Sequence, residues 1–458
     1  MIAKAAFKAY DLRGRYPEEI NEELAYQVGR AFSVLYKPDK VVVGRDVRLT
    51  SKSLADELIR GFTDGGTNVI DIGLCGTEQV YHATAAMEAQ GGVMVTASHN
   101  PMNYNGLKLV GEGAKPISAD TGLLDIYALL EKELFVQEVA PGKIKGKSSE
   151  VNTLDHYLNY LFSLVSPEEM KPLKVVLNGG NGCAGPIAEA LETRLPLKFI
   201  HLNMIPDGTF PNGVPNPLLI KNREETAKAV LENKADLGIA WDGDFDRCFF
   251  FDHNGRFVDS YYLVGFLAER FLQKAPGSAI IYDPRVIWNT EEVVAKAGGE
   301  PIECRGGHAF MKESLRKYDA IYGGEASGHH FFKDFHYCDS GMLPWLHVVA
   351  ELSKRGNSLA EVVDAAMAKY PISGEINRRV DDAEKVIAKV EALYASDAVS
   401  INHIDGLSIS YPEWRFSLRM SNTEPLTRLN IETRGNPQLL EEKIEELLAH
   451  IGGEPDDH

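Results

Sequence analysis

The sequence predicts an α/β protein of several domains, and three observations lead to this fold class. The chain has 458 residues, enough for three or four domains of ordinary size, and 44% hydrophobic residues can give each domain a buried core. Short, continuously apolar runs are followed by glycine-rich or polar turns and then by amphipathic segments. This strand–turn–helix order recurs three times, as expected for parallel or mixed sheets.

Each of the three units contains a strand, a helix and a second strand. We expect them at 40–43, 51–64 and 68–72 in the first unit, at 173–178, 186–192 and 197–202 in the second, and at 278–283, 290–297 and 300–305 in the third. The pattern alone leaves open whether the units are true internal repeats, because strand–helix repetition is common in α/β proteins.

The composition changes after the segment YPISGEIN (370–377). A charged helix is expected at 381–394, alternating strands through SLRMSN and LTRLNIET, and a closing helix at 439–450, which together predict a smaller α+β domain. A polar, lysine-rich and glycine-rich segment at 140–150 reads as a linker. The expected domains are therefore 1–145, 146–252, 253–370 and 371–458.

The overall charge and the cysteines restrict the function. A net charge of −18 and a pI near 5.2 oppose sequence-independent binding to nucleic acid or to an anionic membrane. Any anionic ligand must therefore bind in a local basic pocket. The five cysteines are scattered singly without a CxxC pair, and the first residues include no continuous apolar segment. We expect a cytoplasmic protein.

The segment VMVTASHNP leads from an apolar strand at 93–95 into small and polar residues that end in a proline. Ser98 would lie at the end of this strand. A serine in a sharp loop can be a nucleophile or a turn-forming residue, and the segment by itself allows both interpretations.

A second cluster, Asp242-Gly243-Asp244-Phe245-Asp246-Arg247, follows a buried-looking strand at 237–241. The three carboxylates repel one another unless a cation neutralises them. Oxygen ligands suit a hard ion such as Mg²⁺ or Ca²⁺, and the pattern of an EF-hand is missing downstream. A solvated acidic turn is the alternative interpretation.

Two further loops carry polar groups suited to a sugar phosphate. In Gly324-Glu325-Ala326-Ser327-Gly328-His329, the carboxylate and the hydroxyl can bond vicinal sugar hydroxyls. In the loop that begins at Arg419, a guanidinium, two hydroxyls and an amide can surround a phosphate. A glycine turn and a polar hairpin turn are the plain structural alternatives.

Together the four loops resemble those of the α-D-phosphohexomutase family, in order and over essentially the whole chain. TASHNP resembles the phosphoserine loop, DGDFDR the metal loop, GEASGH the sugar-specificity loop and RMSNTEP the distal phosphate loop. The resemblance implies four domains around a central cleft. The first three domains share one topology, so we expect the three units to be true repeats.

The resemblance also implies roles for residues outside these loops. Tyr10 and Arg13 in KAYDLRG would lie at the cleft, and Lys108 in YNGLKLV would approach the reacting oxygen. Arg285 in YDPRV and His308 in RGGHAF would contact the substrate. For His308 the alternative is a histidine bonded by the backbone of its own turn.

The implied reaction stores a phosphoryl group on Ser98. Mg²⁺ would bridge this phosphate and the three aspartates, Arg247 would neutralise charge, and either Lys108 or His308 would move the proton of the sugar hydroxyl. The incoming phosphate would be anchored by Arg419, Ser421, Asn422 and Thr423. A hexose 1,6-bisphosphate intermediate would turn end for end within the cleft.

The sugar loop resembles that of bacterial phosphomannomutases of GDP-mannose synthesis for surface polysaccharide. Glu325 and Ser327 would contact the sugar, whereas Ala326 replaces a common methionine. A glucose-specific or dual-specificity enzyme, a Mg²⁺-dependent sugar phosphatase and a non-catalytic binding protein are the alternatives. The expected partner is a small hexose phosphate, and the enzyme is expected to be a monomer or a homodimer.

Overall fold

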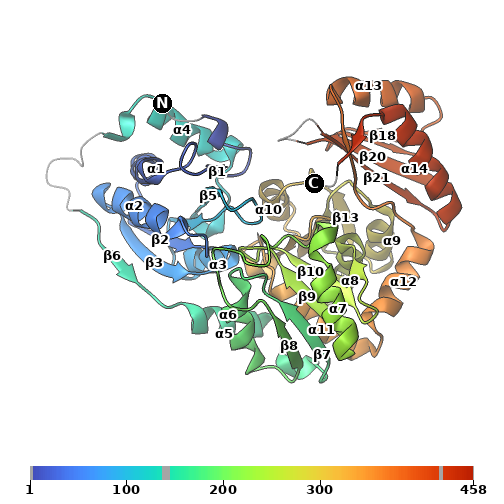
Figure 1. Ribbon diagram of the computed structural model, residues 1–458, viewed down its shortest axis with the longest axis horizontal. Helices are drawn as coiled ribbons and strands as arrows, with labels where there is room; N and C mark the ends of the chain where they lie inside the picture. The colour runs from blue at the N-terminus through green and yellow to red at the C-terminus, as the bar shows by residue number, and fades with distance from the viewer. Residues whose placement is uncertain (1–3, 137–144, 422–425, 457–458) are drawn as a thin grey trace.

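Four separate β-sheets organise the chain, and helices cover both faces of the first three (Figure 1). The structure, a computed structural model, describes residues 4–136, 145–421 and 426–456. Three sheets mix parallel and antiparallel strands, and the fourth is antiparallel throughout. The predicted fold class, three similar α/β domains followed by a smaller α+β domain, is confirmed.

Domain I has the strand order β1-β5-β4-β2-β3-β6. Val41 and Val43 of β2 pack with helices α1 and α2, whereas Val42 packs with Val80 of α3 on the other face. Both faces are covered, so the strand has three consecutive valines, 41–43, at its centre. The elements are β1 (Leu12–Arg15), α1 (Glu22–Tyr36), β2 (Lys40–Arg45), α2 (Ser51–Asp64), β3 (Asn68–Leu74), α3 (Thr77–Ala86), β4 (Gly91–Val95), β5 (Tyr104–Gly111), α4 (Leu123–Glu131) and β6 (Ser148–Glu150).

Domain II has the order β11-β10-β9-β7-β8. Val175 and Leu177 of β7 pack with α5 and α6, and Val176 packs with Val230 of α7 on the opposite face. The elements are α5 (Leu154–Leu164), β7 (Lys174–Asn178), α6 (Ala184–Glu192), β8 (Lys198–Leu202), α7 (Glu224–Asn233), β9 (Leu237–Trp241), β10 (Cys248–Asp252) and β11 (Phe257–Val258).

Domain III has the order β13-β12-β14-β15-β16. Ile280 of β12 packs with α8, and Ile281 packs with Leu315 of α10 on the other face. The elements are α8 (Ser260–Lys274), β12 (Ala279–Tyr282), α9 (Trp288–Lys296), β13 (Glu300–Glu303), α10 (His308–Lys317), β14 (Tyr322–Gly324), β15 (His330–Phe332), β16 (Cys338–Asp339), α11 (Leu343–Arg355) and α12 (Leu359–Lys369).

The first three domains repeat one topology. In each, a central strand pairs in parallel with two neighbours. One of these neighbours also pairs with a fourth, antiparallel strand on its other side. The matching sets are β3-β2-β4-β5, β8-β7-β9-β10 and β13-β12-β14-β15. The three units found in the sequence are therefore repeats of one structural unit.

Domain IV is a sheet of order β18-β19-β20-β21-β17-β22 with helices α13 and α14. Phe416, Leu418 and Leu429 lie in its core with Leu447 of the closing helix. The elements are β17 (Ile376–Arg379), α13 (Ala383–Tyr394), β18 (Ser400–Asn402), β19 (Leu407–Ser410), β20 (Trp414–Met420), β21 (Leu426–Thr433), α14 (Pro437–Ile451) and β22 (Glu454–Pro455).

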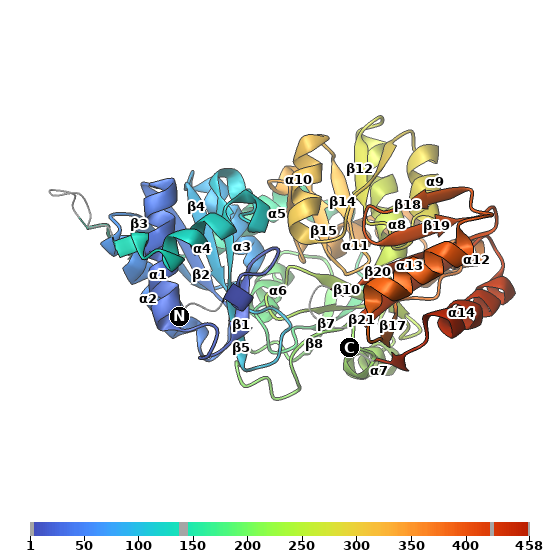
Figure 2. The same cartoon turned by 90° about the horizontal axis from the view of Figure 1, so that it is seen from above.

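The domains follow one another along an arc, with domain I and domain IV at its ends (Figure 1, Figure 2). One buried carboxylate joins the first three. Glu78 at the start of α3 accepts hydrogen bonds from Tyr157 of domain II and from Ser340, Gly341 and Met342 of domain III. The last two donors are backbone N–H groups directly before helix α11, where a helix N-terminus favours negative charge.

The pKa of Glu78 leads to a pH-dependent stability. Burial raises this pKa to about 8, although the four donors favour the charged form. The pKa of Glu78 is higher in the folded than in the unfolded protein. Between these two pH values the folded protein therefore binds one more proton than the unfolded protein. Stability is therefore lost as pH rises from about 5 to about 8. Glu78→Gln removes this titration.

We expect the free energy of unfolding of the wild type, relative to Glu78→Gln, to fall by roughly 3 kcal/mol over that pH range. Urea denaturation at several pH values measures it. Glu189→Gln on α6 is the matched control, since Glu189 is exposed, and its profile should run parallel to that of the wild type. A parallel profile for Glu78→Gln as well would contradict the prediction.

Candidate active site

The three aspartates of the metal loop converge at the end of strand β9. Asp242, Asp244 and Asp246 are buried, and their oxygens lie within 4.8 Å of one another. Burial raises the pKa of Asp242 to about 6. Burial also opposes ionisation of Asp246, but Lys108 and His329 outweigh it and lower the pKa of this residue. The loop therefore holds concentrated negative charge away from water.

The donor set of the metal loop fits a hard divalent cation. Asp244 Oδ1 and Asp246 Oδ1 are buried and accept no hydrogen bond from the residues that the structure describes. Unpaired buried carboxylate oxygens are costly, and oxygen-only ligands are those that Mg²⁺ prefers. The alternative of a solvated acidic turn is excluded, because these residues are at most 1% exposed.

Lys108 of strand β5 reaches the metal loop from domain I. Its Nζ lies 2.6 Å from Asp244 Oδ2 and 2.5 Å from Asp246 Oδ2. Burial works against the charge of Lys108, but the two aspartates raise its pKa above the ordinary value. Lys108 is therefore held as a cation, which suits charge neutralisation better than proton abstraction.

The phosphoserine loop packs against the metal loop. Ser98 donates from Oγ to Asp242 Oδ2 at 2.7 Å, and Arg48 donates to Ser98 O at 2.9 Å. Ser98 has φ +48, a left-handed conformation that is strained for a residue with a Cβ. A Cβ at Gly243 would lie 2.5 Å from Ser98 O, so only glycine permits this approach.

Arg247 completes the contact between the two loops. Its Nε donates to Asp242 Oδ2 at 2.9 Å, and its guanidinium also contacts His99 Nδ1. The pKa of His99 lies well below its ordinary value, first because of burial and then because of the Arg247 cation. A fixed cation thus stands beside the Ser98 hydroxyl.

Of the two N-terminal residues of the predicted site, Tyr10 reaches across to domain III, whereas Arg13 makes its contacts within domain I. Tyr10 donates to Gly306 O at 3.3 Å, and its ring lies 5.4 Å from the ring of His308. Arg13 donates to Asn100 Oδ1 at 2.8 Å. Burial, followed by the Lys312 cation, holds the pKa of His308 well below its ordinary value. A neutral imidazole at this position can accept a proton.

The sugar-specificity loop is fixed by its own polar contacts. Gly307 donates its N–H to Glu325 Oε1 at 2.6 Å, and Arg285 Nη2 lies 3.8 Å from the same oxygen. The Ser327 hydroxyl lies 3.1 Å from His329 Nδ1. Although burial opposes ionisation, His329 and Arg285 lower the pKa of Glu325 to about 2.

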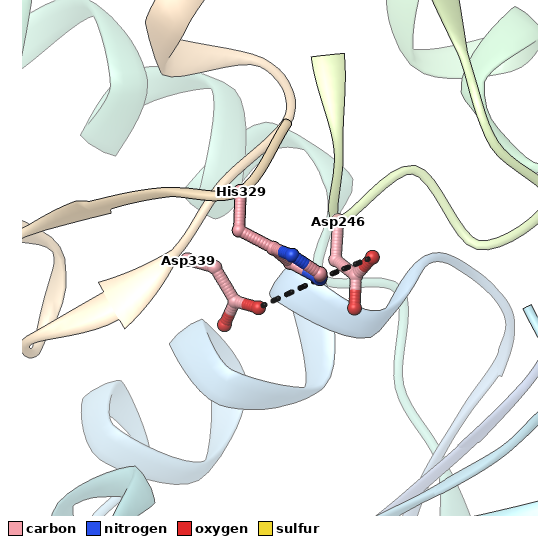
Figure 3. A group of neighbouring side chains, drawn as sticks. All are labelled: Asp246, His329 and Asp339. Carbon is pink, nitrogen blue, oxygen red and sulfur yellow. Dashed lines mark ion pairs between the residues drawn. The ribbon is translucent and has the colours of Figure 1, made fainter. Parts of the chain in front are cut away.

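His329, to which the sequence assigned no role, connects the sugar loop with the metal loop (Figure 3). Its Nδ1 lies 3.3 Å from Glu325, and its Nε2 lies 3.6 Å from Asp246 and 3.9 Å from Asp339. These carboxylates raise the pKa of His329 despite its burial. Asp246, His329 and Asp339 also fit a metal, but Lys312 lies 2.7 Å from Asp339 and already neutralises it.

Glu375, which the sequence analysis did not identify, connects the distal phosphate loop to domain III. It accepts a hydrogen bond from Arg419 at 2.8 Å and one from Arg428 at 3.0 Å, and Arg285 lies 3.9 Å away. These three cations outweigh burial and lower the pKa of Glu375 to about 2. Ser421 donates its N–H to Leu426 O at the end of the hairpin.

These contacts connect the metal loop with Ser98, with Lys108, with the sugar-specificity loop and, through Arg285 and Glu375, with Arg419. Two predicted residues are not described. Asn422 and Thr423 lie outside the described residues. The predicted basic pocket is locally balanced, because each of its cations has a carboxylate partner: Asp11 for Arg13, Asp244 and Asp246 for Lys108, Asp242 for Arg247, Asp283 for Arg285 and Glu375 for Arg419. A substrate phosphate must therefore compete with these carboxylates.

Comparison with protein families matches all four domains. Models described as phosphoglucomutase/phosphomannomutase alpha/beta/alpha domains I, II and III match residues 4–137, 155–255 and 259–370, and the C-terminal domain model matches 375–450. No described helix is both long enough and apolar enough to span a membrane.

Individual relatives agree with the family models. The chain is 52% identical to a phosphomannomutase of Salmonella montevideo, over 96% of this chain and 98% of that protein. It is 52% identical to a protein of Xanthomonas campestris named "Phosphohexose mutases", over 98% of this chain and 99% of that protein. A crystal structure of a family protein from Burkholderia thailandensis superposes with a TM-score of 0.88 at 29% identity, covering 99% and 100% of the two chains.

Fold, site and relatives define an enzyme, an isomerase of the intramolecular phosphotransferase class. The chain belongs to the phosphoglucomutase/phosphomannomutase family. The non-catalytic binding protein considered from the sequence is thereby excluded.

The compensation of the metal loop by Lys108 predicts a large loss of stability. Lys108→Met leaves buried carboxylates without their cation, and we expect the free energy of unfolding to fall by about 3–5 kcal/mol in the presence of a chelator. Urea denaturation measures the loss, and added Mg²⁺ should restore part of it. Lys228→Met, at an exposed site of α7, should change stability little. Equal stability of the two variants would contradict the prediction.

Proposed function

We propose that the enzyme is a phosphomannomutase that interconverts mannose 6-phosphate and mannose 1-phosphate by way of a phosphoserine at Ser98. The observation that carries this proposal is the 2.7 Å contact between Ser98 Oγ and Asp242 within the buried carboxylate cluster. A nucleophilic serine beside a cation site is the arrangement that phosphoryl transfer requires. The 52% sequence identity to bacterial phosphomannomutases supports the choice of reaction.

Mg²⁺ is the proposed cofactor, held by Asp242, Asp244, Asp246 and the phosphate on Ser98. When bound, it neutralises the charge of the phosphoryl oxygens and so favours their transfer. Arg247 and Lys108 add fixed positive charge beside the same group. An N-acetylphosphoglucosamine mutase of Aspergillus fumigatus was solved in complex with GlcNAc-6P and magnesium. At 14% identity, its likeness to this chain is one of fold only.

The distal phosphate of the sugar would bind at Arg419, Ser421, Asn422 and Thr423 of domain IV. Arg419 is 18% exposed at its side chain, so it can contact a ligand while Glu375 orients it. A phosphate placed there competes with Glu375 for the guanidinium of Arg419. The phosphate is favoured because it can accept two parallel hydrogen bonds from the guanidinium. The opposite end of the sugar then faces Ser98.

Proton transfer is assigned to His308 rather than to Lys108. The low pKa of His308 leaves a neutral imidazole that can accept the proton of the attacking hydroxyl, whereas the carboxylates keep Lys108 charged. His329, with its pKa raised beside Glu325 and Asp246, is the complementary proton donor. Tyr10, Arg13 and Arg285 are assigned to binding of the substrate.

The first transfer would produce a hexose 1,6-bisphosphate that turns end for end and then returns its other phosphate to Ser98. Glu325 and Ser327 would bond the sugar hydroxyls in both orientations, since a carboxylate and a hydroxyl accept from either face of the ring. Ala326 leaves this loop with a small side chain. The resulting mannose 1-phosphate would supply GDP-mannose for bacterial surface polysaccharide.

The second candidate is a dual-specificity phosphohexomutase that also accepts glucose phosphates. The name "Phosphohexose mutases" of two Xanthomonas campestris relatives, which specifies no single hexose, favours it. We also propose the domain limits 1–145, 146–252, 253–370 and 371–458, a cytoplasmic location, and a monomeric or homodimeric state. The matched ranges of the four family models support the division of the chain.

The proposed phosphoserine predicts the behaviour of one variant. Ser98→Ala removes the atom that carries the phosphoryl group, so turnover should fall at least about 1,000-fold while mannose 1-phosphate still binds. A coupled assay of mannose 6-phosphate formation measures turnover, and calorimetry measures binding. Ser163→Ala on the exposed face of α5 should keep full activity. Undiminished mutase activity in Ser98→Ala would refute the proposal, and phosphate release without isomerisation in the wild type would favour a phosphatase.

The choice of sugar is tested by substrate comparison. Mannose 1-phosphate and glucose 1-phosphate are assayed separately, each with and without hexose 1,6-bisphosphate activator. We expect a higher kcat/KM for mannose 1-phosphate, and comparable values would establish the dual-specificity enzyme. Chelation of divalent cations should abolish both reactions, and Mg²⁺ should restore them, because the buried carboxylates need a cation to bind phosphate.

A further inference from the structure

A polar cavity in domain II lies outside the site described above. It has a volume of about 110 Å³ and is lined at its base by Asn178, Ala240 and Trp241. These residues stand at the carboxyl ends of the neighbouring parallel strands β7 and β9. The chain passes from β7 to β8 on one side of β7, and then crosses to β9 on the other side of β7. The cavity therefore lies between β7 and β9, where the strand order reverses. Open α/β sheets bind ligands at this point.

The same turn follows the central strand in each of the three repeated domains. A side-chain oxygen at the strand end accepts the backbone N–H two residues later. The three pairs are Asp46 with Arg48 at 2.9 Å, Asp283 with Arg285 at 3.0 Å, and Asn178 with Gly180 at 3.0 Å. The three positions are therefore structurally equivalent, although their side chains differ.

In domains I and III an arginine side chain fills the equivalent crevice. Arg48 extends from the end of β2 to the loop after β4, where it donates to Ser98 O at 2.9 Å. Arg285 extends from the end of β12 toward Glu325 in the loop after β14, at 3.8 Å. Each arginine also pairs with the aspartate of its own turn.

Domain II has Gly180 at the arginine position and therefore keeps its crevice open. Gly180 has φ +57, and a Cβ there would lie 2.4 Å from Pro215. No side chain can extend from this position toward the loop after β9. The segment that includes Pro215 forms the outer wall of the cavity.

Amides dominate the lining of this cavity. Asn178, Asn203, Asn212, Asn216 and Asn222 all contribute to it. Four of them are engaged with neighbouring groups, whereas the buried Oδ1 of Asn216 accepts no hydrogen bond within the described parts of the chain. A buried acceptor without a donor is costly, so a ligand hydroxyl that reached Asn216 Oδ1 would stabilise it.

We propose that this cavity binds a small neutral polyhydroxylated molecule, of the size of glycerol or a sugar alcohol. Amide groups both donate and accept, as hydroxyl groups do, and a ligand hydroxyl can donate to Asn216 Oδ1. The carboxylate of Glu225 at the rim opposes an anion, although Lys221 stands nearby. This site is distinct from the candidate active site, because its lining includes neither Ser98 nor the three aspartates.

The test uses the full-length enzyme with glycerol or mannitol as the probe. Saturation-transfer NMR measures the binding. Binding should saturate with one site and should persist when glucose 1,6-bisphosphate fills the catalytic cleft. Asn216→Ala should weaken it about five- to tenfold, as expected for one lost hydrogen bond. Val214→Phe, which fills the cavity from its lining, should abolish saturation. Asn159→Ala, on the exposed face of α5, is the matched control and should bind like the wild type.

The variants are first checked for mutase activity and thermal unfolding, which should match the wild type. Displacement of both polyols by the bisphosphate would place them in the catalytic cleft and overturn the proposal. Equal binding to Asn216→Ala, Val214→Phe and the wild type would also overturn it. Inorganic phosphate is the anionic probe, and its saturable, Asn216-dependent binding without polyol binding would refute the neutral class of ligand.

Discussion

The burial of three carboxylates within 4.8 Å of one another is the constraint on which the active site depends. Each charge removed from water costs several kcal/mol unless a partner compensates it. Arg247 compensates Asp242 within domain II, but Asp244 and Asp246 are compensated by Lys108, which comes from strand β5 of domain I. Neither domain can satisfy the cluster alone. Docking of the two domains therefore completes the candidate cation site.

The same docking fixes the hydroxyl of Ser98. Ser98 has a strained φ of +48, and its carbonyl oxygen is held by Arg48 from one side and approached by Gly243 from the other. A strained residue persists only where its surroundings determine its conformation. Thr77 of α3, the helix that also carries Glu78, adds a second contact between the domains. Its hydroxyl donates to Asp244 Oδ2 at 2.5 Å. The hydroxyl is thus positioned before any substrate arrives.

The sequence predicted most of the fold because both faces of the central strands are buried and therefore apolar. Strand β9 and helix α2 match their expected limits, whereas α6 begins two residues early, at Ala184, since Pro186 is tolerated in a first helical turn. The site was predictable where its residues are contiguous. Glu375 was missed because its partner Arg419 lies 44 positions away, and an isolated glutamate looks like a solvated one.

The three repeats show how one backbone device serves different chemistry. The turn after each central strand is the same, so the fold alone does not decide what the carboxyl end of each sheet does. Arg48 supports the backbone of the phosphoserine loop, and Arg285 bridges the sugar loop and, through Glu375, domain IV. At the equivalent place, Gly180 leaves space. In domain II, Lys108 and Thr77 of domain I hold the loop after β9 instead. The carboxyl end of its own sheet keeps the cavity for which we propose a ligand.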